Sequence, residues 1–205
     1  DKTLIRASST FPVGNTMIRS HRPSGWVPGC NNIGIKDVYL VGRAAKDIHA
    51  IDFGDCNYFH LYRLRADLFD KAISFNRWID EGRTGTSPNL TYPRTLFPSL
   101  GGQVYFGKIE MCAAINCVRA LYYAGVYNRN TEISCTWSSC ALAYDLSNER
   151  GVYETNTFMT CNIEGCKSAF EWFFSINSPY HNVWINTSID NGNPDFTCLA
   201  KDPGR

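Results

Sequence analysis

The sequence lacks a long hydrophobic run and an excess of either charge. No stretch of 18 apolar residues occurs and no basic start leads into an apolar run, so we expect neither a membrane-spanning segment nor a retained signal peptide. The 20 Lys and Arg nearly balance the 19 Asp and Glu, and this gives no reason to expect nucleic acid as a partner. Low-complexity segments are absent, as are internal repeats apart from a recurring cysteine gap.

The chain is nevertheless long and apolar enough to fold. Its 205 residues are 44% hydrophobic, which suits one domain with a substantial core. Charge is unevenly spread: residues 1–65 hold nine basic and five acidic residues, whereas residues 129–205 hold five and nine. The two regions therefore carry about +4 and −4, which suggests either a basic half that faces phosphates or two complementary surfaces of one domain.

Nine cysteines indicate an oxidising compartment. Three pairs have four residues between their members: Cys112 and Cys117, Cys135 and Cys140, and Cys161 and Cys166. Zinc sites use closer pairs or nearby histidines, so this spacing favours disulfides and predicts no metal site. Sequons at Asn89 and Asn186 also fit a secreted, extracellular glycoprotein. The ninth cysteine is either free or bonded to another chain, which leaves the oligomeric state open.

Hydrophobic patterning indicates a mixed structure with many strands. Apolar residues at helical spacing predict helices at residues 34–46, 67–79 and 168–175. Branched and aromatic residues predict strands at residues 4–8, 57–66, 103–111, 117–127 and 152–161. Gly, Pro, Ser and Thr are abundant between residues 82 and 102, as in a long loop.

Four short segments resemble a known toxin family. They are Asp1-Lys-Thr-Leu-Ile-Arg-Ala-Ser-Ser-Thr-Phe-Pro12, Asp37-Val-Tyr-Leu-Val-Gly-Arg43, the stretch from Tyr58 to Phe69, and Lys108-Ile-Glu110 with the residues after it. In this order they resemble segments of the secreted ADP-ribosyltransferase toxins of the cholera, heat-labile enterotoxin and pertussis type. The resemblance covers roughly residues 1–128.

This resemblance implies an α+β fold. Such a fold has two small antiparallel sheets split around a cleft with flanking helices, here stabilised by three or four disulfides. Residues 1–128 would form the ADP-ribosyltransferase-like core. The cysteine-rich residues 129–205 would pack on it as part of the same domain.

The resemblance also implies a site for NAD as a substrate. Glu110 would be catalytic, since a carboxylate stabilises the positive charge that develops on the ribose when the nicotinamide bond breaks. Arg6 would bind the pyrophosphate or a ribose oxygen. Tyr62 would stack on the nicotinamide, with Tyr58 and Trp26 as other candidates. Lys108 stands where the family orients the acceptor, which would be a host protein.

The family's Ser-Thr-Ser element is missing, and this motivates other hypotheses. Gly25-Trp26-Val27 stands in its place, so the protein could instead be an inactive effector that binds a host or target protein. A disulfide-rich surface module unrelated to these toxins is a third possibility.

Individual residues also have ordinary interpretations. Arg6 could be an exposed charge at a strand edge, Glu110 and Lys108 a surface ion pair worth at most about 1 kcal/mol, and His60 a packed histidine.

Overall fold

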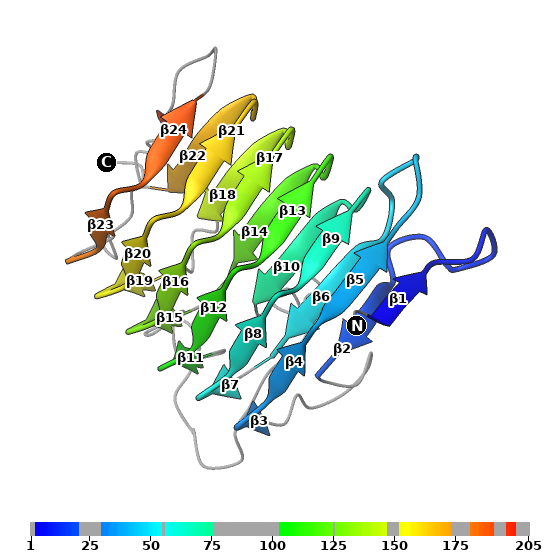
Figure 1. Ribbon diagram of the computed structural model, residues 1–205, viewed down its shortest axis with the longest axis horizontal. Coiled ribbons are helices and arrows are strands. Elements are labelled where there is room, and N and C mark those ends of the chain that lie inside the picture. The colour runs from blue at the N-terminus through cyan, green and yellow to red at the C-terminus, as the bar shows by residue number, and fades with distance from the viewer. Residues whose placement is uncertain are drawn as a thin grey trace, which may run out of the picture.

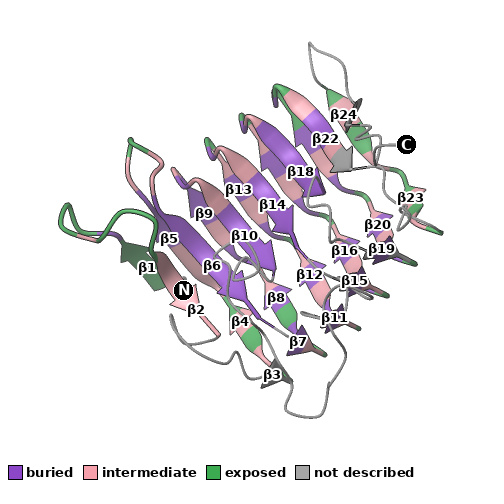
Figure 2. Cartoon of the chain, turned by 180° about the vertical axis from the view of Figure 1, so that it is seen from behind, coloured by how far each residue is buried: buried purple, intermediate pink, exposed green. Residues whose placement is uncertain are grey.

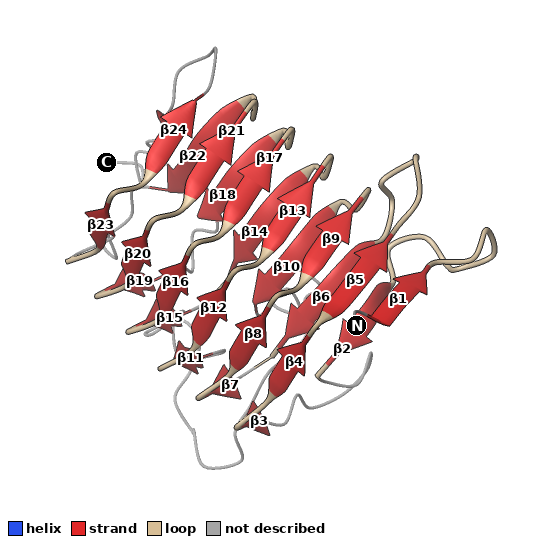
Figure 3. Cartoon of the chain, viewed as in Figure 1, coloured by secondary structure: helices blue, strands red, loops and turns tan. Residues whose placement is uncertain are grey.

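The protein is a parallel β-solenoid built from four sheets. The computed structural model describes residues 3–20, 30–54, 56–75, 103–124, 126–146, 152–173, 181–190 and 196–199. These residues form 25 strands and no helix (Figure 3). Every strand pair is parallel, and successive strands up to β22 belong to sheets A, B, C and D in turn; β23, β24 and β25 then belong to D, A and B. One circuit through the four sheets is a rung, and the rungs stack along one axis (Figure 1).

The sheets are defined by their strands in spatial order. Sheet A contains β1 (Thr3–Arg6), β5 (Val38–Val41), β9 (Arg65–Asp67), β13 (Ala113–Ile115), β17 (Thr136–Ser138), β21 (Asn162–Glu164) and β24 (Ser188–Asp190). Sheet B contains β2 (Thr16–Arg19), β6 (His49–Phe53), β10 (Lys71–Phe75), β14 (Arg119–Tyr123), β18 (Leu142–Leu146), β22 (Ser168–Phe173) and β25 (Phe196–Leu199). Sheet C contains β19 (Val152–Glu154), β15 (Val126–Asn128), β11 (Gln103–Tyr105), β7 (Cys56–Asn57) and β3 (Cys30–Asn31). Sheet D contains β23 (Val183–Ile185), β20 (Thr157–Met159), β16 (Thr131–Ile133), β12 (Lys108–Glu110), β8 (His60–Tyr62) and β4 (Gly34–Lys36).

A five-residue period places the side chains of sheets C, D and A. Two residues of each five are buried, one at the middle of a strand and one at the following corner, and the residue before that corner is exposed. Along one rung the buried residues are Val104, Gly107, Ile109, Cys112, Ala114 and Cys117, and the exposed ones are Phe106, Met111 and Asn116. The interior is therefore filled by stacked rows of equivalent side chains, one from each rung.

The exposed corner residues have left-handed backbone conformations. Examples are Tyr58, Met111 and Ser134, with φ of 56°, 52° and 52°. Each costs about 1 kcal/mol or more for a residue with a side chain. Their N–H groups donate to carbonyl groups of the next rung: Tyr58 N to Tyr105 O at 3.0 Å, and Met111 N to Ile133 O at 2.9 Å. Hydrogen bonds between rungs thus offset the strain of the turns.

The rungs differ in length without any change in register. Along sheet D, Gly34 pairs with His60, His60 with Lys108, and Lys108 with Thr131, which are steps of 26, 48 and 23 residues. The long step contains residues 76–102, so the long loop predicted at residues 82–102 lies outside the described part. The boundary predicted at residue 128 falls between β15 and β16 of one rung, and all four sheets extend on both sides of it.

The middle strands of sheet B differ from those of sheets A and D in being covered on both faces. All five residues of β6 and of β18 are buried (Figure 2). Side chains of a strand point alternately to the two faces, so complete burial requires cover on the outside as well as on the inside. The outer faces of sheets A and D, where described, remain accessible.

The predicted α+β fold and the family resemblance are wrong. The described residues contain no helix, the sheets are parallel rather than antiparallel, and no split pair of sheets surrounds a cleft. The predicted helices at residues 34–46 and 67–79 are, where described, strands and corners, and β22 replaces the helix at residues 168–175. A five-residue period places apolar side chains at spacings of two and three, which imitates the i, i+3 pattern of a helix over short stretches.

The predicted disulfides are also wrong. Seven cysteines are free and buried, and the side chains of Cys30 and Cys198 are not described. The four-residue gap reflects the five-residue period: Cys112, Cys135 and Cys161 stack at the corner between sheets D and A, and the other three stack at the corner between A and B. Their thiols contact carbonyl groups, as Cys135 Sγ contacts Ile109 O at 3.5 Å. The spacing therefore reports rung geometry rather than disulfide bonding.

Candidate functional site

The outer face of sheet D gathers most of the candidate functional residues. Each of its strands directs its first and third side chains outward, so two parallel rows run along the solenoid. The first row is Gly34, His60, Lys108, Thr131, Thr157 and Val183, and the second is Lys36, Tyr62, Glu110, Ile133, Met159 and Ile185. Charged and aromatic residues lie on the first three strands, whereas on the last three the second row is apolar and the first row has two threonines and a valine. We call these the charged half and the apolar half of the face.

The charged half is a connected cluster on β4, β8 and β12. The Glu110 carboxylate contacts Lys108, whose Nζ lies 2.7 Å from Oε2, and His60, whose Nε2 lies 3.3 Å from the same oxygen. The Lys36 ammonium lies 5.6 Å from the centre of the Tyr62 ring, and Lys36 is the most exposed of these cations, at 69%. Arg63 also lies 5.8 Å from this ring, and Asp37 lies within 4.0 Å of both Lys36 and Arg63. Three basic side chains, Lys36, Arg63 and Lys108, thus accompany two carboxylates around Tyr62.

The electrostatics of this cluster keep Glu110 ionised. Its hydrogen bond with the Lys108 ammonium lowers the pKa of Glu110 below its usual value, and the nearby imidazole of His60 acts in the same direction. A carboxyl group with a lowered pKa is a poor proton donor at neutral pH. Glu110 can therefore balance positive charge but is not suited to serve as a general acid.

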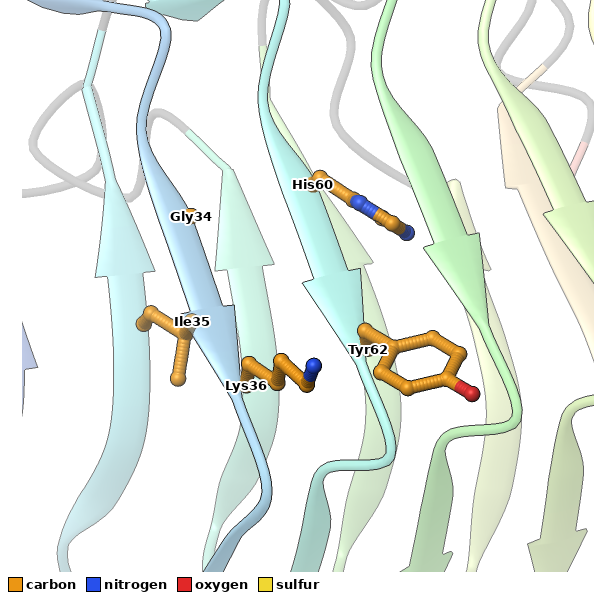
Figure 4. A pocket seen from close by; sticks show the side chains of 5 residues that line it. All are labelled: Gly34, Ile35, Lys36, His60 and Tyr62. Carbon is orange, nitrogen blue, oxygen red and sulfur yellow. The ribbon is translucent and has the colours of Figure 1, made fainter.

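A shallow pocket lies at the start of the charged half. It has a volume of about 520 Å³ and is lined by Gly34, Ile35, Lys36, His60 and Tyr62. Figure 4 shows these side chains on the neighbouring strands β4 and β8. Because position 34 is a glycine, no side chain covers this part of the sheet. The pocket offers an ammonium group, an imidazole and an aromatic ring to a ligand.

Exposed hydrophobic surface is concentrated on sheet D and its corners. Eight large apolar side chains stand out as exposed among the described residues, and five of them lie there: Tyr58, Phe106, Met111, Val183 and Ile185. Tyr58 and Phe106 stack with ring centres 5.2 Å apart. Ile133 and Met159, both partly exposed, connect the charged residues to Ile185 along one row. Contiguous exposed apolar surface marks an interaction site more often than scattered residues do.

The structure brings together three of the four residues predicted for the NAD site. Tyr62 pairs with Glu110 in the ladder, and Lys108 contacts Glu110 directly. Arg6 lies elsewhere, on β1 of sheet A. The ladder of this sheet leads from Arg6 through Val41 and Asp67 to β13, which is the strand that follows β12 in the chain. Arg6 is three strand spacings, or about 14 Å, from Glu110 along the axis, and on a different face. The predicted pair of Arg6 and Glu110 therefore does not surround one cleft, and Trp26 lies outside the described residues.

Several residues of this face were not singled out from the sequence. They are Lys36 of the pocket and the apolar residues Ile133, Met159 and Ile185. The signal that could have found them is their spacing of 26 residues, which recurs between Cys135 and Cys161. A search for rungs of that length would have aligned the outward rows.

In the described part of the chain, no group of three or more His, Cys, Asp or Glu residues is placed to hold a metal ion. The same residues include no helix long and apolar enough to cross a membrane. No protein-family model, curated protein or solved structure matches the chain.

Proposed function

We propose that the protein is a binding module that uses the outer face of sheet D to recognise a partner protein. The observation that carries this proposal is the concentration of exposed apolar side chains on this face, next to a cationic cluster. Aromatic, Met and Arg side chains are enriched where proteins bind one another. A rigid sheet also loses little conformational entropy on binding.

The partner that fits this face carries apolar side chains beside acidic ones. Its apolar residues would cover Ile133, Met159 and Ile185, and its carboxylate would enter the pocket between Lys36 and His60. Charge complementarity supports this orientation, since Glu110 is already balanced by Lys108 at 2.7 Å. Asp37 is shared by Arg63 at 3.0 Å and Lys36 at 4.0 Å, so three cations face two carboxylates and one positive charge is left for the ligand.

Phage display tests this function: peptides of random sequence are selected for binding to the purified protein. We expect selected peptides to combine acidic and apolar residues and to bind Ile133→Ser about tenfold more weakly, because one central apolar contact is worth about 1 to 2 kcal/mol. Lys36→Glu should weaken binding as well. The matched control is Ile115→Ser, since Ile115 is the partly exposed third residue of β13 in sheet A. Failure to select any peptide, or equal losses in Ile133→Ser and Ile115→Ser, would contradict the proposal.

Secretion and a host or target partner remain predictions of the sequence. The described cysteines no longer support secretion, because they form no disulfides. The sequons still do, and Asn186 is exposed at the corner between β23 and β24. A shift in mass on enzymatic deglycosylation of the protein from a secreting eukaryotic host, smaller in Asn186→Gln than in the wild type, would support this route.

NAD as a substrate also remains a prediction, but the resemblance that motivated it is wrong. Titration calorimetry with NAD, compared between the wild type and Glu110→Gln, measures it directly. We expect no heat of binding, because the Arg6 and Glu110 side chains lie on different faces of the solenoid.

A further inference from the structure

The outer face of sheet A has an apolar centre between two ends of opposite charge. We call its end at β1 the head and its end at β24 the tail (Figure 1). Leu40, Ala114 and Ile163 are fully buried, so the residues on either side of them in their strands point outward. Two outward rows therefore run along the solenoid. One is Leu4, Tyr39, Arg65, Ala113, Thr136, Asn162 and Ser188, and the other is Arg6, Val41, Asp67, Ile115, Ser138, Glu164 and Asp190.

The apolar centre is formed by β13 and the corner before it. Ala113 and Ile115, the outward residues of β13, are both partly exposed. Met111 at the corner is 53% exposed. The strands on either side, β9 and β17, carry polar or charged residues at both outward positions. An apolar core within a polar rim is the composition expected of an interface between proteins.

The two ends of the face differ in the sign of their charge. Toward the head, Arg65 is balanced by Asp67 at 2.8 Å, whereas Arg6 is exposed on β1. Toward the tail, Glu164 and Asp190 are both exposed. The sequence has the same polarity, since residues 1–65 carry about +4 and residues 129–205 about −4. The face is therefore positive at its head and negative at its tail.

A second copy of the chain matches this pattern when it is related by a two-fold axis that runs along β13. This axis places the two outer faces against each other and the solenoids antiparallel, so that each head lies on a tail. Every strand then faces the strand at the same distance on the opposite side of β13 in the other copy. Met111, Ala113 and Ile115 each meet the same residue of the other copy. Arg6 meets Asp190, because both lie three strand spacings, or about 14 Å, from β13 in the same outward row.

Charge favours this antiparallel arrangement over the parallel one. A two-fold axis along the solenoid would place head on head and tail on tail, where like charges repel. The antiparallel arrangement instead forms the contact between Arg6 and Asp190 twice, once at each end. Glu164 then faces Val41, one strand away from Arg6, and adds to the attraction.

The size of the face sets the strength of such a contact. Seven strands about 4.8 Å apart, with the corners beside them, cover roughly 34 Å by roughly 15 Å. Each copy would bury about 500 Å², or about 1,000 Å² in total, which is near the lower limit for a specific interface between proteins. The association is therefore expected to be weak and reversible.

We propose that two copies of this chain form a dimer through the outer faces of sheet A, with antiparallel solenoids and β13 at the two-fold axis. The same surface is used by both copies, so the contact is closed and association stops at the dimer. The inference goes beyond partner recognition by sheet D and uses a different face.

Sedimentation equilibrium of the full chain, at concentrations from about 1 µM to about 500 µM, tests this proposal. We expect the wild type to pass from monomer to dimer with no larger species. Ile115→Asp should raise the dissociation constant at least about a hundredfold, because it places two carboxylates face to face at the two-fold axis. Ile133→Asp is the matched control, since it makes the same change on the outer face of sheet D and should leave the dimer unchanged.

Exchange of the charges at the two ends tests the antiparallel arrangement. Arg6→Asp and Asp190→Arg, both at exposed positions, should each raise the dissociation constant about tenfold, since each replaces two ion pairs with like-charge contacts. The chain with both changes should dimerise as the wild type does, because each carboxylate introduced at position 6 meets a guanidinium introduced at position 190. An equimolar mixture of the two single variants should form mixed dimers in preference to dimers of either variant alone.

Three results would overturn the dimer. They are a wild type that stays monomeric at every concentration, oligomers larger than a dimer, and equal effects of Ile115→Asp and Ile133→Asp. Failure of the double charge variant to recover dimerisation would overturn the antiparallel pairing of Arg6 with Asp190.

Discussion

Sheets A and D follow the same period but present different outer faces. In sheet A, Arg65 contacts Asp67 at 2.8 Å, Tyr39 donates to the same carboxylate, and the outward residues of β17 and β21 are polar. In sheet D the corresponding positions carry Ile133 and Met159. Both sheets bury one side chain per three-residue strand, so the fold does not demand this difference. Outward positions are free to vary, so the apolar row of sheet D is not a requirement of the fold, and it is the feature on which the proposed binding face depends.

Two glycines test how tightly the corners beside these sheets are packed. A Cβ atom at Gly107, before β12, would lie 1.8 Å from the Phe59 ring, and one at Gly42, after β5, would lie 2.1 Å from the Leu68 carbonyl oxygen. We expect either Gly→Ala change to lower the free energy of unfolding by about 3 kcal/mol, measured by urea denaturation. Phe59→Leu should recover part of the loss for Gly107→Ala, whereas the obstacle at Gly42 is backbone.

Gly34→Ala is the matched control for these changes. Its added Cβ would meet nothing closer than the His60 carbonyl oxygen at 3.8 Å, which is an ordinary contact. It should therefore leave stability nearly unchanged. Equal stability of Gly107→Ala and Gly34→Ala would show that the corner into sheet D is not packed as described.

The interiors behind the two sheets differ in polarity. Behind sheet D, Glu132 is buried and accepts hydrogen bonds from Tyr123 at 2.6 Å and Tyr144 at 2.9 Å, whereas the equivalent position behind sheet A is Trp137. Burial raises the pKa of Glu132 to about 8, compared with about 4.3 in an unfolded chain. The folded protein therefore retains a proton that the unfolded chain releases between these values. Its stability falls as pH rises through this range.

Glu132→Gln should remove this pH dependence. We expect the wild type to lose up to about 1.4 kcal/mol of unfolding free energy per pH unit relative to Glu132→Gln between about pH 5 and about pH 8. Urea denaturation of both proteins at several pH values gives the difference. Glu110→Gln, on the outside of the neighbouring strand, should show no such loss because the pKa of Glu110 is lowered. Parallel pH profiles for wild type and Glu132→Gln would contradict a proton held at this site.

The corners on the two sides of sheet D contain different ladders. At the corner between sheets C and D, Asn156 Oδ1 accepts the N–H of Asn130 at 3.0 Å, and Asn156 Nδ2 donates to Tyr127 O at 3.0 Å. At the corner between D and A, Cys161 Sγ contacts Met159 O at 3.6 Å. Thiols are weak hydrogen-bond donors, so their removal costs little. Removal of the Asn156 amide leaves buried backbone N–H and C=O groups without a hydrogen-bond partner. Asn156→Ala should therefore cost about 2 kcal/mol and Cys161→Ala clearly less, by urea denaturation. Equal costs would contradict this role for the asparagines.

The sequence predicted individual strands better than it predicted their arrangement. Residues 4–8 were expected to be a strand, and β1 covers most of them. The corners could not be predicted, because residues such as Tyr58, Leu68 and Phe106 adopt left-handed conformations where turn-forming residues would be expected. Their N–H groups are satisfied by the next rung, a long-range contact that local patterns do not encode. For the same reason Lys108 and Glu110 could be predicted as a surface pair, but their alignment with His60 and Tyr62 could not.

The smallest expected effect concerns the cysteine ladders that border sheet A on both sides. The seven described thiols are free and buried, and burial raises the pKa of Cys112 to about 11. The Cys112 thiol therefore holds little thiolate, and burial keeps all seven thiols from contact with disulfide reagents while the protein is folded. We expect the melting temperature to be the same with and without a thiol reductant. Titration with a disulfide reagent should detect at least seven thiols after unfolding without reductant, and few before. A lower melting temperature in reductant, or fewer than seven thiols in the unfolded chain, would mean that neighbouring rungs are joined by disulfides and that the cysteine gap has a covalent role after all.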